Sequence, residues 1–251
     1  DIDGWRLDAA DEVAHDFWKS LRKKIKSVKP DALIIGEIWH YTSSYLQGDE
    51  WDTIMNYNFR TNVADYFATH TITASNFVYE FGFIRGNAHT NVHQILWNLI
   101  DSHDTGRFLH CASERKEALK LAATVQMITP GMPMIYYGDE VGITGGQDPD
   151  CRRGMLWEEQ LQDTNMLNWY KKLIQIRKNN KCLTNGIFKY LEINDEKNLI
   201  VMRAYNDTEE RYIIIHNGDD IVTVNSLAGK TNLLTDAIFD GTVSPYEAII
   251  L

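Results

Sequence analysis

The sequence predicts an α/β fold in which a parallel sheet with crossover helices is followed by a small antiparallel β domain. Over the first two thirds of the 251 residues, short apolar segments alternate with longer amphipathic ones. This is the pattern of parallel strands joined by helices. The helical period then disappears at about residue 181, and short β-rich segments follow, separated by turns of Asn, Asp and Gly. These observations indicate two structural parts of different type.

The first strands and helix are predicted from the opening 36 residues. Residues 4–7 form a strand candidate, and apolar residues three or four positions apart over residues 11–28 predict a helix. Acidic residues lie early in this segment and lysines late, as the helix dipole favours, and Pro30 ends it. Residues 33–36 (LIIG) are a continuous apolar run, as expected of a strand that is covered on both faces.

The remaining elements follow from the same rules. Before the β domain the sequence predicts three more strands, at residues 53–55, 94–100 and 134–136. It also predicts an Ala- and Leu-rich helix at residues 115–128. Five short strands are expected in the β domain, at residues 188–193, 199–205, 212–216, 221–225 and 247–251. We therefore expect one domain over residues 1–180 and a β-sandwich domain over residues 181–251.

The number of parallel strands distinguishes a closed barrel from an open sheet. Five strands are predicted, whereas a closed (β/α)8 barrel needs eight and typically about 250 residues. Counting alone therefore also allows an open five-stranded sheet. Because the chain begins almost directly in an apolar strand, we expect a truncated barrel that lacks its first three strands.

Composition restricts the partners and the location. The formal net charge of −10 disfavours nucleic acid and anionic membranes as partners, whereas a neutral sugar would feel little of it. No apolar run approaches the roughly 20 residues that cross a bilayer. Three cysteines, Cys111, Cys151 and Cys182, lie far apart. Their number and spacing fit free thiols in a reducing compartment, so we expect a cytoplasmic protein.

Three carboxylates share one kind of position in the sequence. Asp8, Glu37 and Asp104 each follow an apolar strand candidate, and Arg6 and His103 lie next to two of them. Each acid taken singly could simply cap the helix that follows. The carboxyl ends of parallel strands, however, form the active face of α/β folds, and three acids at such ends favour catalysis.

Three segments resemble short motifs of the α-amylase family and occur in the family's order: residues 4–10 (GWRLDAA), 36–40 (GEIWH) and 100–105 (IDSHDT). Residues 129–140 also look like the family's last barrel strand and the turn after it. Residues 145–153, together with the GEIWH form, resemble the neopullulanase, cyclomaltodextrinase and maltogenic amylase group. The resemblance covers the whole chain but only the carboxyl-terminal half of such an enzyme. It implies strands 4 to 8 of a (β/α)8 barrel.

The resemblance also implies a role for each residue of the motifs. Asp8 becomes the nucleophile of a retaining mechanism, and Glu37 becomes the general acid/base. Asp104 becomes the carboxylate that binds sugar hydroxyls and supports the oxocarbenium-like transition state. Arg6 orients Asp8 and keeps it ionised, and His103 donates hydrogen bonds to the sugar at the point of cleavage.

Three further residues are candidates for substrate binding by the same resemblance. Trp39 is a candidate platform for a glucose ring, with core packing as an equal alternative. Asp148 and Arg152 are candidates for a distal subsite, but an internal salt bridge of their loop is slightly favoured.

The chain departs from the family pattern at several points. Asp11 stands where the family usually has Asn, and Gly106 stands where it usually has Glu or Asn. The family's Asp–Asn-His motif is absent, and its usual calcium sites and its dimerising amino-terminal domain belong to the part that precedes this one. We therefore expect no metal and no cofactor in this chain.

The resulting expectation is hydrolysis of α-1,4-glucosidic bonds in cyclodextrins, pullulan or maltodextrins, with transglycosylation left open. A conventional α-amylase or α-glucosidase is the nearest alternative. An alternative of another class is a non-catalytic half barrel that binds carbohydrate or associates with itself. Exposed barrel edges predict association between copies, and hence a homo-oligomer.

Overall fold

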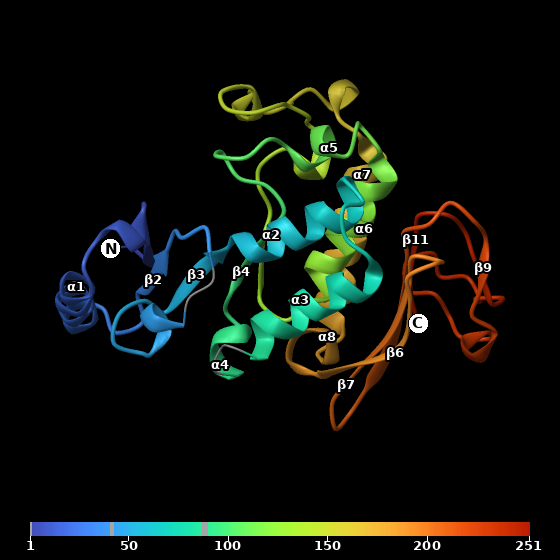
Figure 1. Cartoon of the computed structure of the whole chain (residues 1–251). Coiled ribbons are helices and arrows are strands. Elements are labelled where there is room, and N and C mark those ends of the chain that lie inside the picture. Colours follow the sequence, from blue (N-terminus) through green and yellow to red (C-terminus); the bar gives the residue numbers. More distant parts are fainter. Residues whose placement is uncertain (1, 41–42, 87–89) are drawn as a thin grey trace.

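In the computed structural model, helices lie between a five-stranded parallel sheet and a four-stranded antiparallel sheet (Figure 1). The structure describes residues 2–40, 43–86 and 90–251, without the side chains of residues 83–91. The parallel sheet and its first helix form the amino-terminal side, and the antiparallel sheet forms the opposite side. The central helices and the antiparallel sheet share one apolar cluster.

The first sheet consists of five parallel strands: β1 (Gly4–Leu7), β2 (Leu33–Gly36), β3 (Thr53–Asn56), β4 (Trp97–Leu99) and β5 (Met132–Met134). Their spatial order, β1-β2-β3-β4-β5, is the order along the chain, and every neighbouring pair is parallel. This consecutive order is the arrangement of successive strands in a β/α barrel. The predicted α/β class and the partial barrel are thus confirmed.

Eight α-helices are assigned within the described ranges: α1 (His15–Val28), α2 (Tyr57–Val63), α3 (Ala74–Gly86), α4 (Thr90–His93), α5 (Phe108–Cys111), α6 (Lys116–Ile128), α7 (Thr164–Asn179) and α8 (Cys182–Asn185). A π-helical turn, Ala64–Ala68, extends α2. Helix α6 is the most enclosed of the long helices, and ten of its thirteen residues are buried. Its Ala- and Leu-rich sequence allows close packing on all sides.

The antiparallel sheet has the order β11-β8-β7-β6, from strands β6 (Ile187–Asn194), β7 (Leu199–Tyr205), β8 (Glu210–His216) and β11 (Glu247–Ile250). A second, two-stranded sheet pairs β9 (Val222–Thr223) with β10 (Thr242–Val243). In β7, Ile200 and Met202 join the core around α6, whereas Leu199 and Val201 face the small sheet. This period-two alternation buries both faces of the strand. The expected antiparallel domain is present, and its boundary at residue 180 stays a prediction.

Before the β domain, three predicted elements have bounds that are wrong by two residues or more. The helix expected from residue 11 begins at His15, because a 3-10 turn occupies Ala10–Glu12 and Val13 has extended backbone (φ −112°, ψ 138°). The strand expected at residues 94–100 is limited to β4. The strand expected at 134–136 is β5, which lies two residues earlier, since its register with β4 ends at Met134. Local pattern does not fix where pairing between strands stops.

Candidate active site

Two acidic residues leave adjacent strands at the same edge of the parallel sheet. The register pairs Leu7 of β1 with Gly36 of β2, so Asp8 and Glu37 come directly after paired positions. The Glu37 amide donates a hydrogen bond to the Leu7 carbonyl oxygen at 2.8 Å. The amide of Ala9 donates to Glu37 Oε2 at 2.7 Å. The turn after β1 thus folds over the Glu37 carboxylate and holds it beside Asp8.

Arg6 lies between these two carboxylates. Its guanidinium forms an ion pair with Asp8 through Nη1, and its Nη2 lies 3.9 Å from Glu37 Oε2. The environments of the two acids differ: the Asp8 side chain is 80% exposed, whereas that of Glu37 is 7% exposed. One accessible carboxylate beside a fixed cation, next to one enclosed carboxyl, is an arrangement that suits a nucleophile and a proton donor.

Asp104 lies in the loop after β4 and is held by two basic side chains. His103 Nε2 lies 3.1 Å from Asp104 Oδ2, and Arg152 Nη2 lies 3.3 Å from Oδ1. The Asp104 amide also donates to Ser102 Oγ at 3.2 Å. The carboxylate therefore has a defined orientation while remaining partly accessible.

Asp148 and Arg152 form the internal salt bridge of their loop, with Arg152 Nε 2.8 Å from Asp148 Oδ1. The same Arg152 Nε donates to the His103 carbonyl oxygen at 2.9 Å, and its Nη2 reaches Asp104. The loop after β5 is thereby attached to the loop after β4. Both residues lie beside the carboxylate site, and their contact with sugar stays a prediction.

Trp39 and Tyr57 connect the two halves of the site. Their rings stack with centroids 4.1 Å apart and planes 17° apart, and the Trp39 side chain is still half exposed. Tyr57 Oη donates to Ser102 Oγ at 2.9 Å. Burial raises the pKa of Tyr57, and the negative charges of Asp104 and Glu37 raise it further. Tyr57 therefore contacts both the segment that follows Glu37, through Trp39, and the segment that precedes Asp104, through Ser102.

The α-amylase catalytic-domain model matches residues 1–162, which include every residue of the site described above. The chain belongs to the α-amylase family. Among relatives, it is 41% identical to neopullulanase 2 of Thermoactinomyces vulgaris, over 100% of the chain and 45% of that protein. It is 42% identical to a cyclomaltodextrinase of Thermoanaerobacter pseudethanolicus, over 93% of the chain and 43% of that protein.

A solved structure agrees with the fold. The ligand-free cyclic α-maltosyl-(1→6)-maltose hydrolase of Arthrobacter globiformis superposes with a TM-score of 0.88 at 31% identity, covering 100% of this chain and 56% of that one. The chain spans less than half the length of the two sequence relatives named above. The match therefore concerns the part of each relative that corresponds to these five strands and the β domain.

Tyr57 and Ser102 are site residues that the sequence analysis missed. Tyr57 follows the third predicted strand at the same sheet edge as the acids. The strand-end criterion selects charged side chains, and an uncharged one there carries no signal without its stacking partner Trp39. Ser102 acts only through hydrogen bonds that depend on tertiary structure.

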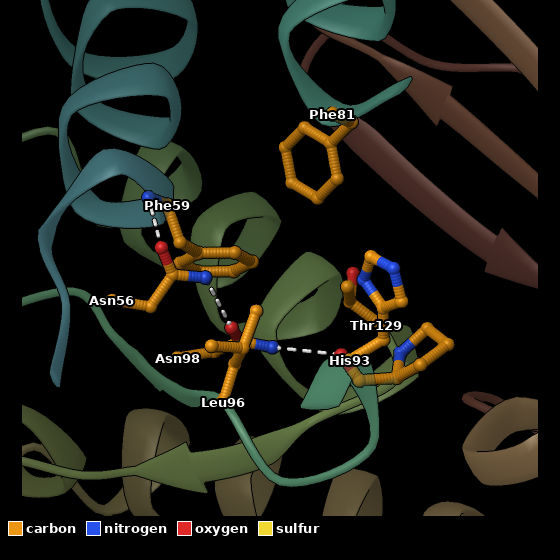
Figure 2. Close-up of a pocket in the computed structure, with 8 residues that line it drawn as sticks. Asn56, Phe59, Phe81, His93, Leu96, Asn98 and Thr129 are labelled. Atoms are coloured by element: carbon orange, nitrogen blue, oxygen red, sulfur yellow. Dashed lines mark hydrogen bonds between the residues drawn. The ribbon is translucent and has the colours of Figure 1, made fainter. Parts of the chain in front are cut away.

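A small cavity of about 20 Å³ is lined by none of the predicted site residues (Figure 2). Across it, Asn56 Nδ2 donates to Asn98 Oδ1 at 2.9 Å, and Asn98 Nδ2 donates to the Pro130 carbonyl oxygen at 3.0 Å. These amides link β3 and β4 to the segment before β5, as Figure 2 shows. The cavity has room for about one water molecule, so it serves the alignment of the strands rather than substrate binding.

Other kinds of site find no support in the described ranges. No group of three or more His, Cys, Asp or Glu side chains there could hold a metal ion. None of the helices in the part that the structure describes is long and apolar enough to span a membrane.

Proposed function

We propose that this chain carries the catalytic carboxylates of a retaining glycoside hydrolase that cleaves α-1,4-glucosidic bonds in cyclodextrins, pullulan or maltodextrins. The observation that carries the proposal is the pair Asp8 and Glu37 on adjoining strand ends, with Arg6 in contact with both. Neighbouring strands lie about 4.8 Å apart. This spacing is on the order of the 5–5.5 Å between the two carboxyl groups of retaining enzymes.

Each residue then has a definite step. Asp8 attacks the anomeric carbon while Glu37 gives its proton to the leaving glycosidic oxygen, which yields a glycosyl ester on Asp8 and a free sugar hydroxyl. Glu37 next takes a proton from a water molecule that attacks the anomeric carbon, and the Asp8 carboxylate is released. Replacement of water by another sugar hydroxyl gives transglycosylation. Arg6 pairs with the Asp8 carboxylate before the attack and again after its release.

The remaining residues act on the sugar. Asp104, which His103 and Arg152 contact, accepts hydrogen bonds from hydroxyl groups of the ring that is cleaved. The exposed part of Trp39 offers an apolar surface on which a glucose ring can stack. Asp148, paired with Arg152, contributes to a distal subsite. The relatives' names, neopullulanase and cyclomaltodextrinase, support α-glucans as the substrate class.

We place this activity in the cytoplasm. All three cysteines are free thiols in the structure, and Cys151 and Cys182 are buried. A reducing compartment preserves such thiols.

Turnover of β-cyclodextrin and maltotriose, with Glu37→Gln as the blank, tests the proposal. The assay is run on the chain alone and on a chimera in which the amino-terminal part of neopullulanase 2 precedes it. Reducing-sugar release that disappears in Glu37→Gln supports the proposal. No release by either form, when both show cooperative thermal unfolding, would exclude it.

A non-catalytic, self-associating module is the second candidate, because β1 is an edge strand with exposed apolar neighbours. Ile2, Trp5 and Val28 are 47%, 49% and 75% exposed, and the first two line a groove of about 310 Å³ together with α1. Reversible association without turnover in the assay above would favour this module over the enzyme.

A further inference from the structure

Arg107 is a completely buried cation outside the predicted site. Its side chain is 0% exposed, and its Nη1 donates a hydrogen bond to Asp139 Oδ1 at 2.9 Å. The same Nη1 donates to the Tyr137 carbonyl oxygen at 2.7 Å, and Nε donates to the Cys151 carbonyl oxygen at 3.0 Å. The guanidinium carbon also lies 4.3 Å from the centre of the Tyr136 ring. Arg107 thus connects its own loop to two separate parts of the segment after β5.

The base of the loop that carries Asp104 is closed at the same place. Both carboxylate oxygens of Asp101 accept the amide of Phe108 at 2.8 Å, and the Arg107 amide donates to the Gly145 carbonyl oxygen at 2.9 Å. Residues 102–107 therefore form a loop whose base is fixed by these hydrogen bonds and which carries the partly exposed Asp104.

A second set of contacts joins the outer part of this loop to the turn that Arg107 holds. Cys151 Sγ and Arg152 Nε both donate to the His103 carbonyl oxygen, at 3.2 and 2.9 Å. Arg152 Nη2 then reaches Asp104. One route of contacts therefore runs from Arg107 through the turn Asp150–Arg152 to the His103–Asp104 pair.

We propose that Arg107 is a positioning residue for Asp104, which acts by fixing the turn Asp150–Arg152 against the His103 backbone. The proposal rests on the function proposed above and extends it to a residue that does not touch substrate. A planar guanidinium can serve acceptors in several directions at once, whereas an ammonium group is a point charge. Arg107→Lys retains the charge beside Asp139 but cannot hold the Tyr137 and Cys151 carbonyl groups in the same geometry.

The kinetic test uses the 251-residue chain and β-cyclodextrin. Since a displacement of about 1 Å at a catalytic group costs on the order of 100-fold in rate, we expect Arg107→Lys to lower kcat by roughly 10- to 100-fold with a smaller change in KM. Arg152→Gln lowers kcat through the same route. The double variant is therefore no slower than the slower single variant. Multiplicative losses in the double variant, or an unchanged kcat in Arg107→Lys, would overturn the proposal.

Hydrogen exchange separates this inference from the proposed function. In Arg107→Lys, peptides covering residues 101–107 and 146–153 should exchange at least about tenfold faster, because their shared contacts open locally. Arg203→Gln is the control, since Arg203 pairs with Glu210 within the β domain, and should leave both peptides unchanged. Faster exchange in a chain without turnover removes the enzyme proposal and supports the positioning contact. Unchanged exchange in Arg107→Lys removes the positioning role whether or not the chain is active.

Discussion

Arg6 is the side chain that joins the two proposed catalytic acids. Arg6 precedes Asp8 by two residues, so both side chains project from the same face of the sheet. Arg6 also approaches Glu37, which follows the neighbouring strand β2. Similar pairings occur at Asp104, which His103 and Arg152 contact from two sides. Each acid of the site is therefore in contact with an arginine, and that arginine has a second partner: Arg6 contacts both Asp8 and Glu37, and Arg152 contacts both Asp104 and Asp148.

Tyr57→Phe tests how far the stack beneath Trp39 contributes to the site. The substitution keeps the ring contact with Trp39 but removes the hydrogen bond to Ser102, which itself accepts the Asp104 amide. Loss of one buried hydrogen bond costs about 1 kcal/mol, and we expect kcat/KM for β-cyclodextrin to fall roughly three- to tenfold. Tyr57→Ala, which also removes the ring, should be worse. Wild-type kinetics in Tyr57→Phe would show that Ser102 orients Asp104 without this bond.

Asp139→Asn tests the charge of the buried acid pair beside Arg107. Burial and the nearby charge of Asp101 raise the pKa of Asp139, to which Asp101 is hydrogen-bonded. The folded chain therefore keeps a proton that the unfolded chain releases above about pH 4. This contribution to stability is complete below that pH and is lost as the pH rises through the raised pKa, by roughly 1.4 kcal/mol per pH unit.

Asn mimics the protonated acid, so Asp139→Asn should flatten the decline of stability between pH 5 and 7. Urea unfolding of the wild type and the variant at both pH values measures the difference. Parallel curves for the two proteins would mean that Asp139 is ionised in the folded state.

At the scale of elements, the sequence predicts the bounds of a strand or helix correctly where local residues alone determine them. Strands β1 and β2 occur at the predicted residues because each is a short apolar run between turns. Strand β5 was misplaced by two residues because its limits depend on pairing with β4. The acids at the ends of β1, β2 and β4 could be located from strand ends alone. Ser102 and Arg107 could not be located in this way, because no local pattern marks them. Ser102 bonds to Tyr57, which is 45 residues away, and Arg107 bonds to Asp139, which is 32 residues away.

Gly36→Ala tests the packing that fixes the strand before Glu37. A Cβ at Gly36 would lie 2.4 Å from Cε3 of the buried Trp51, so either the ring or β2 must shift. Overpacking of this kind costs about 1–3 kcal/mol, and the shift should also reduce turnover because Glu37 follows directly. Gly82→Ala is the control: it lies in α3 with nothing within 4 Å of the added Cβ, and should be neutral or stabilising by up to about 1 kcal/mol. Equal stability of the two variants in urea would contradict this account of β2.

For the whole molecule, the antiparallel sheet is part of one continuous core with the helices. Ile200 and Met202 of β7 and Ile213 and Ile215 of β8 belong to the same apolar cluster as α6. The β domain is therefore not an appendage of the parallel sheet. The opposite side of the molecule differs, because β1 is an edge strand with exposed apolar residues beside it.

The β1 edge predicts reversible association of the chain. Exposed strand edges and apolar patches pair with other copies, and the groove between Trp5 and α1 supplies such a patch. We expect the chain to sediment as a concentration-dependent mixture of monomer and dimer. Trp5→Lys together with Val28→Lys should shift it toward monomer, whereas Ile221→Lys, at an exposed position of the β domain, should not. A strictly monomeric wild type at high concentration would rule out the association.

Covalent trapping at Asp8 tests the central claim most directly. In Glu37→Gln, maltosyl fluoride needs no acid to leave, but the ester formed is no longer hydrolysed efficiently, so a glycosyl-enzyme should accumulate. The reaction is run on the chain and on its chimera with the amino-terminal part of neopullulanase 2, followed by peptide mass spectrometry. We predict a maltosyl adduct on the peptide that contains Asp8, and none when Asp8→Asn is added. An adduct on another residue, or its absence in a form whose wild type turns over β-cyclodextrin, would contradict the assignment of Asp8 as the nucleophile.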